Sequence, residues 1–418
     1  MSRRLFPLLA TIGLSILGMA GTIWGPRFYG ATAWALPDDL WATLTAAQRL
    51  LHGDLGGLYT PPTNLVSFPG AAIILVPIVA LIDAVGLPIT IPGPQGANHD
   101  VWLLAGFYQV AISAVVLFAA DAIAEHLGVS RPKRALLAAA SATALWNVTV
   151  RWGHPEDAVA TGLLLLAILA LYQSKTARAG WLIGAAVAIQ PLVLLALPIL
   201  LAVIEPRRIA GFLARSAGPA VLLLAAAAAA NWQATITAVT KQPNYPTVDH
   251  PTPWLFLAPH LSRTTVAAGP ARTLAIVVAC GCAVAVGLRW RARRRDRAEP
   301  SAGWTQDELR EILWWTGVAL ALRCVFESVM VAYYPWPPLA VALIVAARTW
   351  PRLLIAGAVA TTLSFVAQDA WRDTWGWYAM VVAGLGVALW AGTPWPARPA
   401  PAQRLPEPGE QFVTDSAP

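Results

Sequence analysis

The sequence predicts an all-α integral membrane protein with about twelve transmembrane helices, and three observations support this fold class. Of its 418 residues, 57% are hydrophobic and only 12% are charged, whereas soluble domains carry about 25% charged residues. The uncharged residues form long blocks, which short basic loops separate, as in polytopic helical membrane proteins. The mean hydropathy is +0.58. The net charge of +7 belongs to those loops and does not indicate a nucleic-acid partner.

Twelve apolar segments are candidates for crossing the membrane. They cover approximately residues 5–24, 65–86, 101–127, 135–150, 156–173, 180–204, 216–231, 270–288, 311–332, 337–347, 353–368 and 375–392. The first follows Arg3 and Arg4 and has the features of a secretory signal. Because many apolar segments follow it, we expect an uncleaved first helix, with residue 25 onward emerging on the outer side.

Two ways of threading the chain through the membrane are open. In one, segment 65–86 crosses and segment 180–204 is a single span. In the other, 65–86 is a re-entrant or juxtamembrane segment, and 180–204 breaks at Gln190-Pro191 into two short crossings. Proline disfavours a helix through the preceding residue, which supports the break. The second threading places 21 Lys and Arg inside and 7 outside, against 16 and 12 for the first, and the positive-inside rule favours it.

We therefore expect one transmembrane domain over residues 1–393 in the plasma membrane. Its outer loops would be 25–64, which we expect to be helical, 87–100 and 232–269. The Pro-rich segment 394–418 reads as a disordered cytoplasmic tail. Cys280, Cys282 and Cys324 all fall in apolar segments and lack zinc-site spacing, so they read as core thiols. No metal or cofactor is predicted.

Several polar stretches fall on the predicted outer face. They are Asp38-Asp39, RWGHPED (151–157), Gln190, KQPNYPTVDHPTPW (241–254) and AYYPWPP (332–338), which follows Arg323 and Glu327 in an apolar segment. Ionisable groups within a membrane are costly and commonly mark function. Each stretch also has a structural explanation, namely helix capping, an i,i+4 ion pair or an interfacial aromatic belt. Those explanations do not account for their gathering on one face.

The residues of the first outer loop match a known pattern. Asp39-Leu40, Ala46-Ala47, Leu50-Leu51, Gly53 and Leu58-Tyr59-Thr60-Pro61 resemble the first outer loop of GT-C glycosyltransferases, in particular the family-87 polyprenol-phosphate-mannose-dependent mannosyltransferases. RWGHPEDAVATGLLLLAILAL (151–171) and AGWLIGAAVAIQPLVLLALPILL (179–201) are also similar to that family. The resemblance covers roughly residues 34–210. Pro155 or Glu156 stands where the family has Gln, and Gln190 stands where it often has Lys.

The resemblance implies a GT-C-like fold and transfer of a sugar, mannose or arabinose, from a polyprenyl phosphate to a lipid-linked or glycan hydroxyl on the outer face. A single inverting displacement needs one carboxylate to accept the hydroxyl proton. Asp39 is the expected base, with Asp38 second, and partial burial is expected to raise the pKa of Asp39. The expected donor-binding residues are Arg151, His154, Glu156, Asp157, Gln190 and Arg323, and the acceptor-binding ones are Tyr59, Tyr245, Asp249, His250 and Trp254.

Two other functions fit the same composition. A transporter or a lipid or glycan flippase also places ionisable groups in its membrane spans. A non-catalytic GT-C-like scaffold of the cell envelope fits the replacement of lysine by Gln190. The first class moves its ligand unchanged, whereas a transferase releases polyprenyl phosphate.

Overall fold

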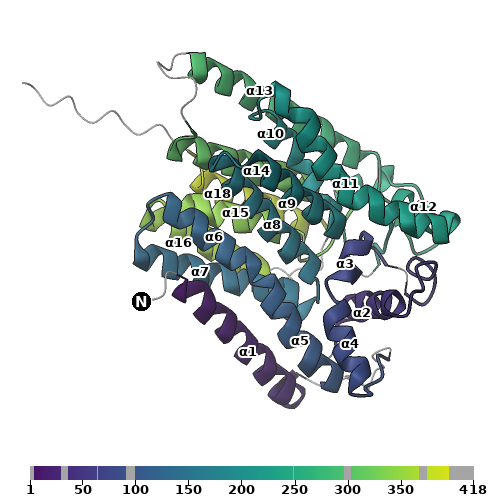
Figure 1. The fold of residues 1–418 in the computed structure, drawn as a ribbon. Helices are drawn as coiled ribbons and strands as arrows, with labels where there is room; N and C mark the ends of the chain where they lie inside the picture. Colours follow the sequence, from purple (N-terminus) through teal and green to yellow (C-terminus); the bar gives the residue numbers. More distant parts are fainter. Residues whose placement is uncertain are drawn as a thin grey trace, which may run out of the picture.

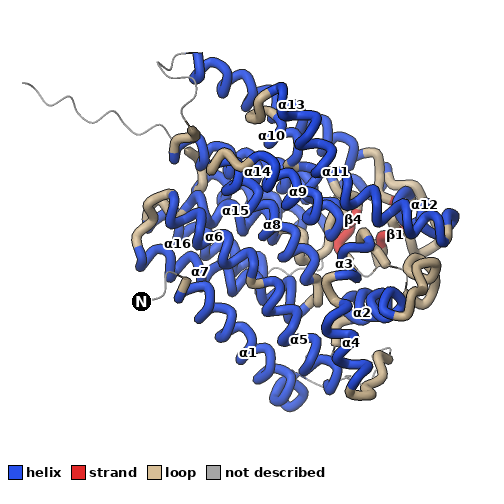
Figure 2. Tube along the Cα trace, in the orientation of Figure 1, coloured by secondary structure: helices blue, strands red, loops and turns tan. Residues whose placement is uncertain are grey.

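The computed structural model describes residues 4–29, 36–63, 65–90, 99–247, 249–295, 303–366 and 374–394. Over these residues the chain is an assembly of helices with a few two-residue strands (Figures 1 and 2). The all-α prediction is confirmed. The predicted loop 87–100 lies largely, and the predicted tail 394–418 almost wholly, outside the described residues.

The helices occupy most of the chain. The α-helices are α1 (Leu5–Tyr29), α2 (Asp38–Leu51), α3 (Pro69–Ile73), α4 (Val76–Ala84), α5 (His99–Ser113), α6 (Val115–His126), α7 (Arg131–Trp146), α8 (Pro155–Tyr172), α9 (Thr176–Ile189), α10 (Leu197–Leu201), α11 (Pro206–Ala230), α12 (Trp232–Thr240), α13 (Ala271–Arg295), α14 (Gln306–Phe326), α15 (Trp336–Ala346), α16 (Trp350–Thr361) and α18 (Thr374–Ala391). The π-helical turns are η1 (Asn147–Arg151) and η4 (Thr362–Val366), and the 3-10 turns are η2 (Pro191–Leu195) and η3 (Pro253–Leu257).

Four two-residue strands form two antiparallel pairs. They are β1 (Pro243–Asn244), β2 (His250–Pro251), β3 (Val266–Ala267) and β4 (Val329–Met330). β1 pairs with β3, with Pro243 opposite Ala267. β2 pairs with β4, with His250 opposite Met330. The second pair fastens the long loop 232–269 to the chain that follows α14.

Four helical stretches of the described chain are long and apolar enough to cross a membrane. They are Asp100–His126, Pro155–Tyr172, Pro206–Ala230 and Ala271–Arg295. Few residues in the apolar stretches of α11 and α13 are buried, as expected for helices that face lipid. The structure thus gives a helical membrane protein. It does not give the predicted twelve helices of this kind. Four further apolar stretches of the described chain are shorter than a span requires, namely Leu5–Gly18, Thr176–Ile189, Trp336–Ala346 and Trp375–Ala391.

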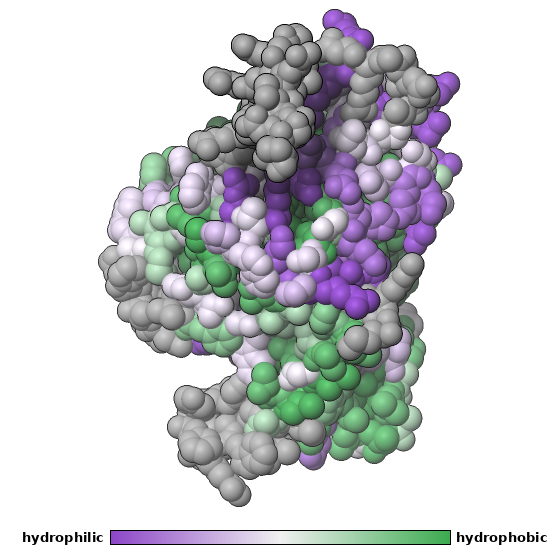
Figure 3. Space-filling view, turned by 90° about the vertical axis from the view of Figure 1, so that its left-hand side faces the viewer, coloured by the Kyte–Doolittle hydropathy of each residue, from purple (hydrophilic) through white to green (hydrophobic). Residues whose placement is uncertain are grey.

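The long helices share two common ends. α2, α3, α4 and the strands lie at one end of the assembly, at the right of Figures 1 and 2. Figure 3 looks onto the opposite end, where many hydrophilic side chains gather. α8 runs from one end of the assembly to the other. It begins at Pro155, next to η1, and ends at Tyr172, before the turn to α9.

Segment 65–86 forms the short helices α3 and α4, which pack against α2. A helix of nine residues such as α4 extends only about 14 Å, so the segment holds no helix that could span a bilayer. α3 approaches α9 closely, because a Cβ on Gly70 would lie 2.3 Å from the carbonyl oxygen of Ala188. Only glycine fits at this contact.

A buried carboxylate joins α1, α6 and α7 at the end shown in Figure 3. Asp121, which is 2% exposed, accepts hydrogen bonds from Nε and Nη2 of Arg134 and from Nη1 of Arg4, each at 2.7 Å. Glu125 lies beside them, 2.9 Å from Arg4 and 3.6 Å from Arg134. One carboxylate of α6 thus holds two cations, Arg134 in α7 and Arg4 directly before α1.

We expect Asp121→Asn to destabilise the protein by about 3 kcal/mol, because the change leaves the buried Arg134 without its main counterion. Thermal or denaturant unfolding in detergent measures the loss. Glu125→Gln is the matched control, and it should cost under about 1 kcal/mol because Glu125 is partly exposed. Equal losses in the two variants would show that burial of Asp121 is not the cause.

Candidate functional site

A polar cavity of about 350 Å³ lies at the end of the assembly that carries α2 and the strands. Its wall is built from α2, the connection between α7 and α8, the end of α9, the loop 232–269 and the chain around α14 and α15. The predicted site residues that line it are Asp38, Asp39, Arg151, His154, Glu156, Gln190, Tyr245, Asp249 and Arg323. The structure therefore brings together residues that are up to 285 positions apart in the sequence.

The two aspartates reach the cavity from the first turn of α2. Pro37 is extended and precedes the helix, and neither carboxylate caps it. α2 is amphipathic, and Leu40, Leu44 and other small or apolar side chains on one face are buried in the core. That burial fixes the helix, so that its N-terminal turn borders the cavity.

A glycine brings His154 against this turn. Gly153 has φ +69°, a conformation that side chains other than glycine rarely adopt. A Cβ at Gly153 would also lie 2.6 Å from Cβ of Leu40 and 3.1 Å from Pro37. Both the turn and the close contact with α2 therefore require glycine here.

His154 bridges two carboxylates. Its Nε2 lies 2.8 Å from Oδ2 of Asp39, and its Nδ1 lies 2.7 Å from Oε1 of Glu156. Its ring stacks on Tyr333 with the centroids 3.9 Å apart. Because each ring nitrogen faces a carboxylate oxygen, both can donate only if the imidazole is protonated.

The electrostatics agree with a protonated His154. Burial lowers the pKa of His154, but the charges and hydrogen bonds of Glu156 and Asp39 outweigh it and leave that pKa well above its ordinary value. Burial also opposes ionisation of Asp39. The charge and hydrogen bond of His154 nonetheless hold the pKa of Asp39 below its usual value. The expectation of a raised pKa for Asp39 is therefore wrong, because it omitted a cation that only the fold brings near.

Two further carboxyl groups, those of Asp249 and Asp38, lie near Asp39 and His154. Burial and the charge of Asp39 raise the pKa of Asp249 to about 6, although His154 acts in the opposite direction. Burial and the charge of Asp39 also raise the pKa of Asp38. Among the three aspartates at the cavity, Asp39 therefore holds its negative charge to the lowest pH.

Gln190 lines the cavity, whereas the predicted site residue Asp157 is buried and does not line it. α9 ends at Ile189, directly before Gln190-Pro191, as the second threading predicts. The side-chain amide of Gln190 then donates to Oδ1 of Asp157 at 2.6 Å. Glu156, the neighbour of Asp157, has a buried Oε2 without a hydrogen-bond partner in the described chain, so this oxygen can accept from a ligand hydroxyl.

Two arginines share one buried carboxylate beside Gln190. Arg272 binds both oxygens of Glu327 at 2.8–2.9 Å, and Arg323 approaches the same group at 3.7 Å. The guanidinium of Arg323 also lies 3.7 Å from the ring centroid of Tyr334. The predicted Arg323–Glu327 pair is present, but α14 ends at Phe326 and Glu327 pairs more closely with Arg272.

An apolar groove of about 260 Å³ adjoins the polar cavity. It runs among η2, α10 and α13, and exposed apolar residues such as Leu194 and Ile276 line it, so it opens on the apolar surface. Gln190, Gln242 and Arg323 line both the groove and the cavity. The polar cavity and the apolar groove thus meet beside Arg323. This arrangement suits a ligand in which an anionic group joins an apolar chain to a polar head.

Comparison of the sequence with protein-family models and with curated proteins finds no match. The chemistry of the site is therefore inferred from its own side chains. Within the residues that the structure describes, no three His, Cys, Asp or Glu side chains converge so as to hold a metal ion. What converges instead is the hydrogen-bonded set Asp39, His154 and Glu156 in the cavity, and the pair Arg272 and Arg323 at the adjoining groove.

Three predicted acceptor residues lie elsewhere. Tyr59 donates to the carbonyl of Ser67 at 3.2 Å. His250 stacks on Trp377 at 3.9 Å, and the indole of Trp254 donates to the carbonyl of Val325 at 2.6 Å. None of the three lines the cavity, so the structure corrects their placement. They secure the loops around it.

Sequence reasoning missed part of the wall. Tyr333 and Tyr334 belong to a stretch that the sequence singles out, yet their contacts with His154 and Arg323 follow only from the fold. Arg272 is one of the seven charges that the favoured threading places outside, and no motif of the sequence marks it as a site residue. Its sequence signal is its position two residues after Pro270, at the start of the long apolar helix α13.

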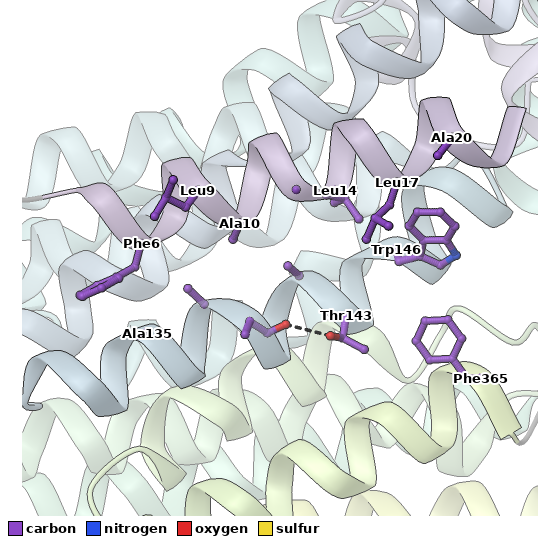
Figure 4. A pocket seen from close by; sticks show the side chains of 14 residues that line it. Phe6, Leu9, Ala10, Leu14, Leu17, Ala20, Ala135, Thr143, Trp146 and Phe365 are labelled. Atoms are coloured by element: carbon purple, nitrogen blue, oxygen red, sulfur yellow. Dashed lines mark hydrogen bonds between the residues drawn. The ribbon is translucent and has the colours of Figure 1, made fainter. Parts of the chain in front are cut away.

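An apolar cavity of about 770 Å³ lies between α1 and α7 (Figure 4). Apolar side chains such as Phe6, Leu17, Trp146 and Phe365 line it. The hydroxyl of Thr143 donates to the carbonyl of Ala139 at 2.9 Å, which satisfies it. This cavity offers no group for acid–base chemistry and is not the candidate site.

Proposed function

We propose that the protein transfers a sugar from a polyprenyl phosphate to an acceptor hydroxyl at the polar cavity, by one inverting displacement. The observation that supports this most directly is the shared junction of Gln190, Gln242 and Arg323 between the cavity and the apolar groove. The isoprenoid chain of the donor would bind in the apolar groove, its phosphate beside Arg272 and Arg323, and its sugar in the polar cavity. Mannose or arabinose as the sugar follows from the family resemblance alone.

Asp39 is proposed as the base. In the displacement, the acceptor oxygen forms a bond to the anomeric carbon while the bond from that carbon to the phosphate oxygen breaks. The acceptor proton passes to Asp39, and the polyprenyl phosphate leaves with the electron pair of the broken bond. A phosphate leaving group needs cations rather than an acid, and Arg323 and Arg272 are placed to supply them.

Glu156 and His154 act through Asp39. Glu156 fixes the orientation of His154 through Nδ1, and Nε2 then holds one oxygen of Asp39. The side chain of Asp39 remains 48% exposed, so its second oxygen is open to an acceptor. Tyr245 and Asp249 lie on the loop wall, where an acceptor would bind.

We further propose that the cavity faces the extracytoplasmic side of the plasma membrane and that the chain crosses twelve times. Arg131, Lys175, Arg207 and Arg310 lie at or next to helix ends opposite the cavity. The positive-inside rule assigns that end to the cytoplasm. Shorter helices such as α15 and α16 would then cross as parts of the packed bundle.

The test is turnover by the purified protein. Radiolabelled polyprenyl-phosphate mannose and arabinose are supplied in proteoliposomes with a lipid extract as acceptor, and released polyprenyl phosphate is measured. We expect release that depends on the acceptor. Donor that moves between leaflets unchanged would assign a flippase, which the same two-part cavity would serve. Donor binding without either activity would assign a scaffold.

The pH dependence tests the role of His154. Asp39 must be ionised to accept a proton, and the protonated His154 lowers its pKa. His154→Gln removes that charge while burial remains, so the pKa of Asp39 should rise and Asp39 should become protonated at higher pH. The acidic limb of kcat/KM should therefore move to higher pH, measured between about pH 4 and 8.

Asp249→Asn is the matched control for this experiment. It removes a neighbouring negative charge, so the same limb should stay or move to lower pH. An acidic limb that is unchanged in His154→Gln would show that His154 does not set the ionisation of Asp39.

A further inference from the structure

A basic pocket of about 500 Å³ lies at the end of the helices opposite the polar cavity. The turn between α8 and α9 forms one side of it, and the start of α11 forms the other. Its basic side chains are Lys175, Arg178, Arg207, Arg208 and Arg215. Since α8 has 18 residues, this pocket lies about 27 Å along the helix from His154.

Close packing of α9 against α11 creates the pocket. A Cβ on Gly184 would lie 2.2 Å from the carbonyl oxygen of Arg215, and one on Gly180 would lie 3.0 Å from Cβ of Arg215. Small residues four positions apart allow helices in membranes to approach in this way. Arg178 on α9 is thereby brought next to the arginines of α11.

The cations of this pocket greatly outnumber the acids. Within the described chain, Glu205 is the carboxylate that pairs with them, at 2.9 Å from Arg207 and 3.2 Å from Arg208. Lys175 donates only to the amide oxygen of Gln173, and Arg215 donates to the carbonyl of Gly211. Elsewhere at this end, Arg134, Arg293 and Arg310 have carboxylate partners, in Asp121, Glu311 and Asp307 respectively. Lys133 and Arg352 donate to backbone carbonyls instead.

Two helix N-termini add to the positive potential. α9 begins after Lys175 and α11 begins after Glu205, and no side chain caps either helix. The first turn of α9 can therefore present its backbone N–H groups to an anion, in line with the general affinity of helix N-termini for phosphate. α11 contributes less, because Pro206 has no N–H and the N–H of Arg208 donates to the carbonyl of Glu205 at 2.8 Å. The positive-inside rule explains basic residues at this end, but not their convergence on one pocket.

Apolar surface continues from the pocket along both helices. Trp181 lies one turn after Arg178 on α9, and Leu222 lies two turns after Arg215 on α11, and both are exposed. A ligand that binds here would therefore place a charged group among the arginines and apolar chains along α9 and α11. Basic pockets between membrane helices bind anionic lipid headgroups through this combination.

We propose that this pocket binds the headgroup phosphate of an anionic phospholipid from the adjacent leaflet. The site is separate from the candidate sugar-transfer site and does not depend on that function. A free phosphate shares the same chemistry, and the acyl chains distinguish the lipid from it.

Native mass spectrometry of the full chain in neutral detergent tests the proposal. The probes are phosphatidylglycerol, phosphatidylcholine and inorganic phosphate. The wild type should bind phosphatidylglycerol more tightly than phosphatidylcholine. Arg178→Gln with Arg208→Gln removes two charges, and should weaken phosphatidylglycerol binding about 30-fold if each cation contributes as surface cations usually do.

The matched control is Arg131→Gln with Arg291→Gln. It removes two exposed arginines at the same end, outside the pocket, and should keep the wild-type preference. A second control, Arg178→Lys with Arg208→Lys, retains both charges and should still bind phosphatidylglycerol. Thermal unfolding without lipid shows whether each variant is folded. Unchanged binding in the Gln pocket variant, or an equal loss in the control, overturns the proposal. Displacement of the lipid by equimolar inorganic phosphate would overturn the assignment to a lipid.

Discussion

Asp39→Asn should lower the rate of sugar transfer by about 10²–10⁴-fold, the usual effect of removing a general base. Asparagine keeps the size of the side chain and a carbonyl oxygen for the Nε2 of His154, but it cannot accept the proton of the attacking hydroxyl. The loss should therefore appear in kcat, with little change in the KM for the donor. Single-turnover assays with saturating donor measure it.

Asp38→Asn is the control for this prediction. Asp38 also lines the cavity, but no hydrogen bond with His154 holds its carboxylate, and burial and the charge of Asp39 raise its pKa. We expect it to lose less than about tenfold, below the range for a general base. Near-full turnover by Asp39→Asn would remove Asp39 from the reaction, and a larger loss in Asp38→Asn would transfer the role to its neighbour.

Arg323→Gln should lower kcat/KM by about 10²–10³-fold, the range found when a donor to developing negative charge is removed. Arg323 lies where the apolar groove meets the polar cavity, only 13% exposed and stacked on Tyr334. A developing phosphate charge at this low-dielectric junction would have few other cations nearby. Arg323→Lys keeps the charge without the planar fork and should lose less.

The controls separate binding of the donor from folding. Glu327 retains its two-oxygen contact with Arg272 when Arg323 is replaced, so the thermal unfolding temperature should change little. Arg151→Gln removes a cation from another part of the cavity wall, where Arg151 is exposed near Trp152, and its effect should be much smaller. Equal losses at both positions would indicate a general electrostatic effect and not a phosphate contact.

The sequence predicts the parts of this site that depend on local chemistry. Pro37 followed by two aspartates and an amphipathic stretch predicts a helix, and α2 begins at Asp38. Gln190-Pro191 predicts a break, and α9 ends one residue earlier. His154-Pro155-Glu156-Asp157 predicts a helix start, and α8 begins at Pro155. In each case proline or a carboxylate acts within one turn of its own position.

The sequence does not predict which charges become partners. The lowered pKa of Asp39 depends on His154, 115 residues away, and on a glycine turn that fits against Leu40. Glu327 could be matched with Arg323 by spacing, but α14 ends between them and Arg272 takes the closer position. Tertiary contacts decide both, and no local pattern encodes them.

The groove beside α13 has a consequence for how rates would depend on substrate. Leu194 and Ile276 open it toward the surrounding hydrocarbon, so an amphiphile would reach it by two-dimensional diffusion. The concentration that governs binding of the amphiphile is then its mole fraction in the membrane and not its molarity in water. If the proposed transfer occurs, adding inert detergent at constant total donor should lower its rate by surface dilution alone.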